Sequence, residues 1–333
     1  IDPVRAPLAN SIRNRGRPMD LLYSNKSANL QRLLAMLVLS VTASVALADT
    51  TQHDFLLLPS VDTRNSFDES DPAVEDSFVR PSLNFLYSYT GGRFRFLAEY
   101  LWSSTESELE RFQLGWRAGE NTMWWLGRFH TASKFWTTEY HHGQFMQTSI
   151  TRPSIEEWED ESGPIPSHVT GIMMEHTQPG SGKDAWSTSF SFGFAPRFVK
   201  DSLEPFDIFD SESDHGLSFN GRLAYQPELF SDNQVGVVLG WNDINADSES
   251  DPALADLDDI QQLTVGIFAD WRWGNLRMLG SLVHFEQDLR YIDGLVKDEF
   301  LAGYLQTEYG VTDKWTVFGR VDYSADEDDS PYL

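Results

Sequence analysis

The stretch that decides the fold runs from Met123 to His168. It begins with the strand-like sequence Met123-Trp124-Trp125-Leu126-Gly127-Arg128-Phe129-His130 and continues through an insert, residues 131–167, that reads TASKFWTTEYHHGQFMQTSITRPSIEEWEDESGPIPS. Connections this long within a compact architecture are usually either functional or without fixed structure. The insert contains aromatic residues, adjacent histidines and a run of acids. This composition argues against a featureless linker, and we expect the insert to fold back among the strands around it.

On both sides of the insert, apolar and polar residues alternate with a period of two. This pattern is typical of strands whose two faces meet different environments. The segments 168–177 and 275–286 alternate poorly, and we assign them as strands mainly by their position. About thirteen strands are expected in all. The clearest segments are 83–89, 94–102, 111–118, 186–194, 217–226, 234–242, 262–273 and 315–323.

Aromatic placement and connection length favour a membrane sheet. Tyr and Trp residues cluster near the ends of the apolar faces, as the girdles of outer-membrane barrels do. Along the chain, the long connections (61–77, 131–167, 199–215, 244–259 and 287–297) and one of modest length (105–107) fall on one side of the predicted sheet. The short connections (91–92, 119–122, 178–184, 227–233, 274 and 310–314) fall on the other side. We therefore predict an all-β fold, a transmembrane antiparallel β-barrel of the outer-membrane type. The alternative is a soluble β-solenoid, sandwich or lectin-like module.

The strand count predicts that the barrel extends beyond this chain. Bacterial single-chain barrels have even strand numbers, because both ends of the chain lie in the periplasm. Thirteen strands would leave the acidic segment 324–329 on the outer side, with no final amphipathic strand. We therefore expect the domain at 49–333 to be incomplete at its C-terminal end, within a barrel of about 14–18 strands.

The first 48 residues are expected to be an upstream segment and a cleaved signal peptide. Basic residues precede an apolar run from Leu33 to Val45, and Ala46-Leu47-Ala48 is a typical cleavage site. The apolar run is too short for a spanning helix of about 20 residues. This segment carries six basic and two acidic residues, so its removal lowers the net charge from −26 to −30. Such an acidic chain is not expected to bind nucleic acid, and without cysteine it has no disulfides or thiol chemistry.

These features together resemble Gram-negative outer-membrane porins. The leader, the aromatic alternating strands, the acidic connections and the end of a strand at Gly127-Arg128-Phe129 before an aromatic insert all carry the resemblance. It implies a channel for passive diffusion of small hydrophilic solutes, with an inward-folded loop that narrows the pore. It also implies location in the bacterial outer membrane, contact with its lipid and lipopolysaccharide, and assembly as a homotrimer.

The faces opposite the aromatic ones carry the candidate pore-lining residues. Arginine stays charged and donates two hydrogen bonds at once to a carboxylate or phosphate group, and rings of basic residues select anions. A basic wall that faces the acidic run of the insert would create a transverse field, with a preference for anionic solutes. Alternatively, the arginines simply pair with acids on neighbouring strands. The candidates are Arg93, Arg95, Arg111, Arg117, Arg128, Arg222, Arg272 and Arg320 on the wall, and Glu156, Glu157, Glu159, Asp160 and Glu161 in the insert.

Histidines near the insert raise the question of a metal site, for which His130, His141 and His142 are the candidates. No HExxH or comparable spacing occurs, so packing of hydrogen-bonded imidazoles is the simpler interpretation, and neither a metal nor another cofactor is expected. No catalytic constellation has a diagnostic spacing either, and we expect a non-enzymatic protein. The alternative to a channel is a plugged, non-conducting barrel that binds a ligand, metal or partner through its loops.

Overall fold

The computed structural model describes residues 51–64, 78–104, 107–140, 147–149, 151–158, 163–199, 202–208, 214–229, 231–247 and 256–325. The chain divides into two units, Ile1–Leu47 and Ala48–Leu333, and every described residue belongs to the second. The predicted signal peptide therefore lies outside the described residues. Within those residues, no helix has the length and apolar character needed to cross a membrane.

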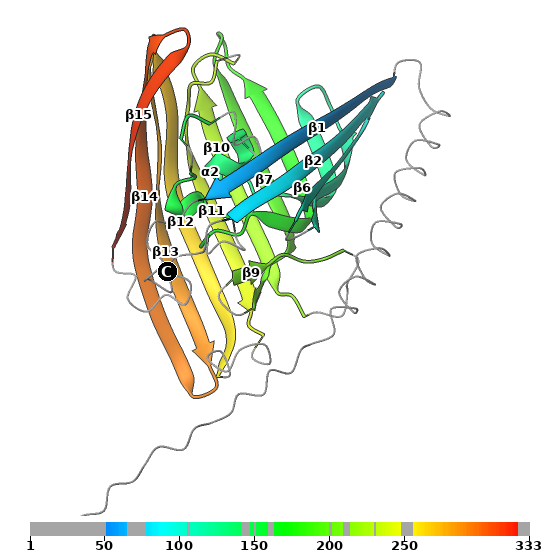
Figure 1. Cartoon of the computed structure of the whole chain (residues 1–333). Helices are drawn as coiled ribbons and strands as arrows, with labels where there is room; N and C mark the ends of the chain where they lie inside the picture. The colour runs from blue at the N-terminus through cyan, green and yellow to red at the C-terminus, as the bar shows by residue number, and fades with distance from the viewer. Residues whose placement is uncertain are drawn as a thin grey trace, which may run out of the picture. The chain divides into compact units, whose positions relative to one another are not determined.

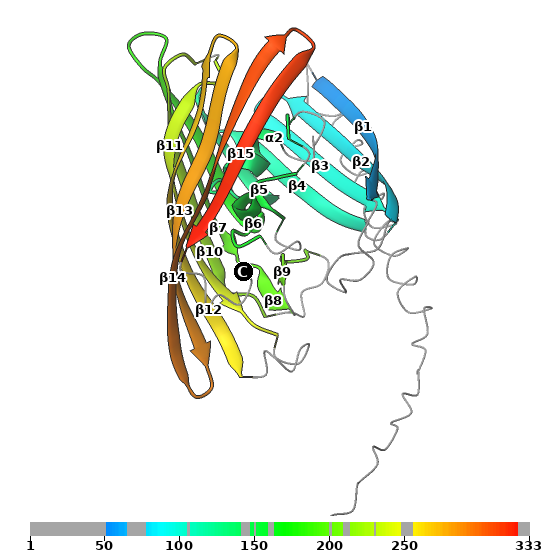
Figure 2. The same cartoon turned by 60° about the vertical axis from the view of Figure 1, so that its left-hand side comes forward.

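A sheet of thirteen antiparallel strands makes up most of the described structure, and its strands lie side by side in chain order (Figures 1 and 2). The edge strands are β1 and β15. The strands are β1 (Thr51–Arg64), β2 (Phe78–Gly91), β3 (Phe94–Ser103), β4 (Ser107–Arg117), β5 (Thr122–His130), β6 (His168–Pro179), β7 (Ala185–Phe194), β10 (Leu217–Gln226), β11 (Gln234–Asn245), β12 (Leu257–Trp273), β13 (Leu276–Tyr291), β14 (Gly294–Thr312) and β15 (Trp315–Ala325).

Four short elements complete the described part of the unit. The insert contains the helix α2 (Phe135–Tyr140) and the 3₁₀ helix η2 (Ser154–Glu156). Strands β8 (Arg197–Val199) and β9 (Ser202–Glu204) form a separate two-stranded sheet.

The prediction of about thirteen strands in a single sheet is confirmed. Two predicted connections are wrong in detail. The segment 287–297 is not a long connection, because β13 continues to Tyr291 and β14 starts at Gly294. The strand continues because Leu289 is fully buried against Phe198 and its neighbours. The paired strands β8 and β9 overlap the start of the predicted connection 199–215, and β8 carries that same Phe198.

The two faces of the sheet differ in the way that the alternation predicts. On β14, the Leu305 side chain is 51% exposed, whereas its neighbour Gln306 is fully buried. Exposed apolar residues such as Ile267 and Val317 continue the outer face on β12 and β15. Buried polar residues such as Asn220 continue the inner face on β10. Aliphatic residues outside and polar residues inside are the arrangement of a membrane barrel wall.

A row of glycines crosses three neighbouring strands just before the insert. Gly127, Gly171 and Gly193 lie opposite one another on β5, β6 and β7. A Cβ atom at Gly127 would lie 2.0 Å from the carbonyl oxygen of Phe112, and at Gly171 it would lie 2.2 Å from that of Phe192. Gly127 also has a φ of +131°, a conformation that side chains disfavour. Glycine therefore allows the backbones to approach closely where β5 runs into the insert.

Candidate functional site

The insert is closed at its neck by contacts between its first and last residues. The backbone N–H of Thr131 donates to the carbonyl oxygen of Ser167 at 2.9 Å, and the Thr131 hydroxyl donates to that of Pro166 at 2.6 Å. Lys134 is fully buried, and its Nζ donates to the carbonyl oxygen of Ile165 at 3.1 Å and to the Ser167 hydroxyl at 2.7 Å. A buried ammonium group needs such partners. The neck is therefore organised around one lysine.

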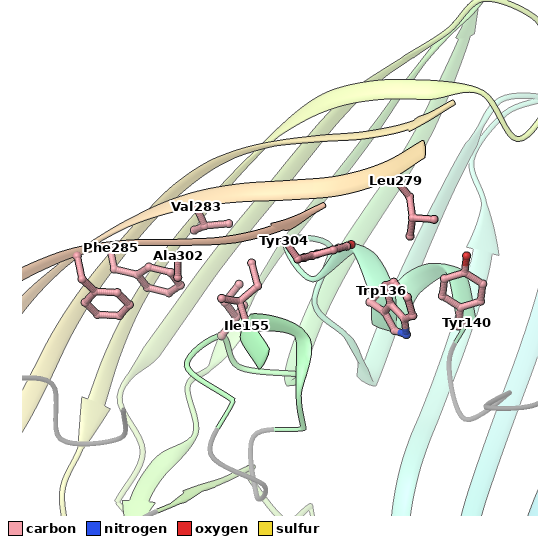
Figure 3. Packing of buried hydrophobic residues seen from close by; sticks show 10 residues of the cluster. Trp136, Tyr140, Ile155, Leu279, Val283, Phe285, Ala302 and Tyr304 are labelled. Carbon is pink, nitrogen blue, oxygen red and sulfur yellow. The ribbon is translucent and has the colours of Figure 1, made fainter. Parts of the chain in front are cut away.

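Apolar residues of the insert pack on the inner face of the last long strands. Figure 3 shows Trp136 and Tyr140 of α2 and Ile155 of η2 beside Leu279 of β13 and Tyr304 of β14. The Trp136 side chain is fully buried, and its ring centroid lies 5.7 Å from that of Tyr304 in an edge-to-face arrangement. This contact buries apolar area on both partners and fixes the insert against the wall.

Arg222 of β10 tethers α2 to the wall. Its guanidinium donates to the Thr138 hydroxyl at 2.9 Å and to the Glu139 carboxylate at 3.3 Å. The same group also lies 4.5 Å from the centre of the Phe268 ring and donates to the Gln234 side chain at 2.6 Å. Arginine suits this position because its planar head stacks and donates in several directions at once.

A second set of polar contacts tethers the other half of the insert. Arg320 of β15 donates to the carbonyl oxygen of Thr151 at 2.7 Å and to its hydroxyl at 2.9 Å. The backbone N–H of Ser154 donates to the Asp322 carboxylate at 3.1 Å. The Gln262 side chain of β12 donates to the carbonyl oxygen of Pro164 at 3.0 Å. The insert is thus held against β10, β12 and β15 by separate contacts.

Arg277 on β13 is a wall arginine that the sequence analysis missed. Its Nε donates to Asp270 at 2.8 Å, its Nη1 lies 3.7 Å from Glu308, and its guanidinium lies 5.6 Å from the centre of the Tyr140 ring. Burial raises the pKa of the Tyr140 hydroxyl, although Arg277 opposes this rise. The missed signal was the weak alternation of 275–286, which hid the inward position of residue 277.

Six of the eight predicted wall arginines fall into three groups. Arg222 and Arg320 hold the insert, as described above. Arg111 pairs with Glu99 at 2.8 Å, and the buried Arg128 pairs with Glu108. Among the described residues, no carboxylate lies within ion-pair distance of Arg95 or Arg117.

One of the predicted wall residues needs correction. Arg93 lies in the exposed turn between β2 and β3, because the turn includes the residue after Gly92. Arg272 is exposed next to the end of β12, and it is paired across the strands with the inner-face Arg277. Its place on the inner face therefore agrees with the prediction.

The acidic run of the insert also differs from expectation. Glu156 is 1% exposed and accepts the backbone N–H of Trp136 at 3.1 Å, so its charge lies inside the insert rather than on a pore surface. Burial raises the pKa of Glu156 to about 7, against the opposing effects of Lys134, the Trp136 N–H and Arg152. Burial also raises the pKa of the half-buried Glu157. Glu159, Asp160 and Glu161 lie outside the described residues.

Of the predicted metal candidates, only His130 is described, since His141 and His142 lie outside the described residues. His130 is buried beside His168 and Glu110, a grouping that the sequence analysis did not predict. These residues are far apart in the sequence, and only strand pairing brings them together.

Comparison with known proteins identifies the fold. No protein-family model matches the chain, and no curated protein matches it. Among solved structures, an anion-selective porin from Comamonas acidovorans matches with a TM-score of 0.53 and 14% identity, over 82% of this chain and 78% of that one. OmpT, an outer-membrane protein of Vibrio cholerae, has a TM-score of 0.40 and 11% identity, over 84% and 88% of the two chains. OccK2 of Pseudomonas aeruginosa, in complex with glucuronate, has a TM-score of 0.41 and 10% identity, over 82% of this chain and 68% of that one.

The first of these matches shows the class of fold, and the other two are too distant to carry an argument. The chain has the all-β fold of outer-membrane β-barrels. Within that class it resembles the porins, as the sequence analysis predicted.

Proposed function

We propose that this chain is a non-enzymatic, porin-like channel of the bacterial outer membrane, through which small hydrophilic solutes diffuse passively. The observation that carries the proposal is the attachment of the insert 131–167 to the inner face of the sheet. Arg222 holds α2 on one flank, and Arg320 holds Thr151 on the other. A loop held in this way narrows a lumen, and its position sets the size of solute that passes.

The charges along the wall support a weak anion preference. The inner-face arginines Arg111, Arg222 and Arg320 each lie beside a carboxylate, so those sites are nearly balanced. Arg95 and Arg117 add positive charge without an acidic partner among the described residues. Basic residues along a pore favour anions. Glu156 itself adds little to the transverse field that we expected from the acidic run of the insert, because that residue is buried.

Single-channel recording in a planar bilayer under a salt gradient tests both parts of the proposal. A steady conductance with a reversal potential on the anion side is the expected result. The double variant Arg95→Gln/Arg117→Gln should shift that potential towards cation preference, whereas the control Arg93→Gln, in the exposed turn, should leave it unchanged. The absence of conductance from correctly folded protein would contradict the channel.

The second candidate function is a plugged barrel that binds a ligand or partner through its loops. The buried cluster between the insert and β13–β14 favours it, because Trp136 and Ile155 fill space inside the sheet. Liposome swelling separates the two candidates. Vesicles that contain a channel swell in small sugars, whereas vesicles that contain a plugged barrel do not.

We further propose that lipid and lipopolysaccharide surround the exposed apolar face, and that three copies assemble as a homotrimer. Outer-face residues such as Leu305 and Val317 support the contact with lipid. Native mass spectrometry in detergent measures the number of copies, and a monomer would remove the trimer from the proposal.

A further inference from the structure

Three buried side chains of metal-binding types meet where the insert leaves and rejoins the sheet. Glu110 lies on β4, His130 is the last residue of β5, and His168 is the first residue of β6. Their exposed fractions are 3%, 8% and 4%. One ligand atom from each lies within 4.8 Å of the other two, and in the described part of the chain no other group of three His, Asp, Glu or Cys residues does this.

The spacing of these atoms is close to that of a metal site. His130 and His168 are directly paired across β5 and β6, and their ring centroids lie 5.0 Å apart. Nε2 of His168 lies 3.0 Å from a carboxylate oxygen of Glu110. A tetrahedral zinc ion with bonds of about 2.0–2.1 Å separates its ligand atoms by roughly 3.4 Å. Small rotations of the side chains would therefore bring all three ligand atoms onto one ion.

An irregularity in β4 aims Glu110 at this point. Along the β3–β4 pairing, Glu99 lies opposite Arg111 and Tyr100 lies opposite Leu109, so Glu110 is the extra residue of a β-bulge. Bulges redirect a side chain out of the regular alternation and are frequent beside functional sites. The β-bulge therefore turns the carboxylate of Glu110 towards the two histidines.

The insert supplies a cover for the site. The Trp158 ring stacks on His168, with centroids 5.9 Å apart and planes at 5°, and it lies 6.1 Å from the His130 ring. Arg152 in turn lies 3.8 Å from the centre of the Trp158 ring. Residues around a metal site orient its ligands and limit the access of water. Trp158 is in position to do both.

We propose that Glu110, His130 and His168 bind one divalent ion of the zinc type, which ties β4, β5 and β6 together at the neck of the insert. Two imidazoles and one carboxylate form a typical set of three protein ligands for such ions, with a fourth position left for water. The carboxylate contributes negative charge that a buried cation requires. This site is separate from the contacts with Arg222 and Arg320, and the proposal stands whether or not the barrel conducts.

Zinc titration of the full chain is the first test. Protein purified in detergent and stripped with EDTA should bind one zinc ion per chain by isothermal titration calorimetry. Glu110→Gln, His130→Gln and His168→Gln should each weaken binding by at least about tenfold, the lower end of what loss of even an outer-shell partner costs. The control His176→Gln changes another histidine of β6, the strand of His168; the His176 ring contacts the Thr122 hydroxyl at 2.8 Å. It should bind zinc as the unchanged protein does.

Zinc K-edge absorption spectroscopy on the unchanged protein gives a test that does not depend on how well the variants fold. The expected first shell contains two imidazole nitrogens and oxygen, at about 2.0–2.2 Å. Fewer than two imidazoles would overturn the proposal, as would the lack of stoichiometric zinc. Zinc that is lost in His141→Gln/His142→Gln but retained in His130→Gln would equally overturn it.

Discussion

The two faces of the thirteen-stranded sheet reverse the arrangement of a soluble protein. The outer face exposes large apolar residues such as Leu305 and Ile267, while the inner face buries amides and charges such as Gln306 and Asn220. Contact with lipid, as proposed above, would remove the usual penalty for exposing apolar groups on the outer face. The difference between the faces teaches that the stability of this sheet depends on hydrogen bonds and ion pairs for the polar groups buried on its inner face. The insert is what covers much of it.

The inner face itself is not uniform. Under the insert, β13 and β14 bury Leu279, Phe285 and Phe300, whereas β10 buries Ser218 and Asn220. The apolar part packs on Trp136 and its neighbours, and the polar part hydrogen-bonds within the wall and to Ser133. Substitutions on each surface therefore test how far the two faces differ.

Removing the Trp136 side chain should have the largest effect. Trp136→Ala leaves a cavity in the buried cluster of the insert, and such changes cost about 3–5 kcal/mol. The matched control Trp315→Ala changes an outer-face tryptophan that is 73% exposed, and it should cost much less. Equilibrium unfolding in guanidinium measures both free energies. Equal losses would mean that the two faces do not differ as described.

A charge on the outer face should have the next largest effect. Leu305→Arg places a cation against lipid, which costs about 2–4 kcal/mol near the middle of the bilayer. Asn275→Arg, in the turn between β12 and β13, should be close to neutral. Unfolding of protein folded into lipid vesicles gives the comparison. If Leu305→Arg left the free energy of unfolding unchanged, this face would not be in contact with lipid.

The buried Glu156 should make stability depend on pH. Its pKa rises from 4.5 to about 7 in the folded chain, so between these values the native state binds more protons than the unfolded state. Stability should therefore fall as the pH rises through this range, by up to about 1.4 kcal/mol for each pH unit. Unfolding at pH 5 and pH 8 measures the fall. Glu156→Gln should reduce the fall in stability, and the control Glu139→Gln should not. If Glu156→Gln left the fall unchanged, another group would be responsible for it.

The polar tether at Arg320 should have the smallest effect on stability. Its ion pair with Asp322 is partly exposed, and such pairs contribute about 0–1 kcal/mol. Arg320→Gln should therefore change the unfolding free energy little. Because the arginine also holds Thr151, the variant should increase the fluctuation of the single-channel current. A loss above about 2 kcal/mol would mean that this tether stabilises the sheet more than an exposed pair does.

The sequence predicted the sheet because most strands have unlike faces. The prediction of strands was weakest where the inner face of a strand is apolar. Leu279, Val283 and Phe285 on β13 point inward against the insert and against β14. Met278 and Leu282 lie on the opposite face, so apolar residues occur on both faces and the alternation weakens. Val169 and Met173 have the same effect on β6, because they join an apolar cluster with Trp125. The same loss of pattern hid Arg277.

The site was predictable only where position along a strand determines the contacts. Arg222 and Arg320 lie on the inner face, as the alternation indicated, and both reach the insert. The sequence could not show that Glu156 turns into the insert, because this depends on how Lys134 and Trp136 fold around it. The group of Glu110, His130 and His168 depends on strand register and on a bulge, and neither is written in residue spacing.

Single-channel conductance of the unchanged chain and of a variant whose residues 136–164 are replaced by a short Gly-Ser linker tests the central claim most directly. If the insert narrows an open lumen, both proteins conduct, and the variant has the larger conductance. An identical conductance in the two proteins would contradict the claim that the insert sets the width of the pore.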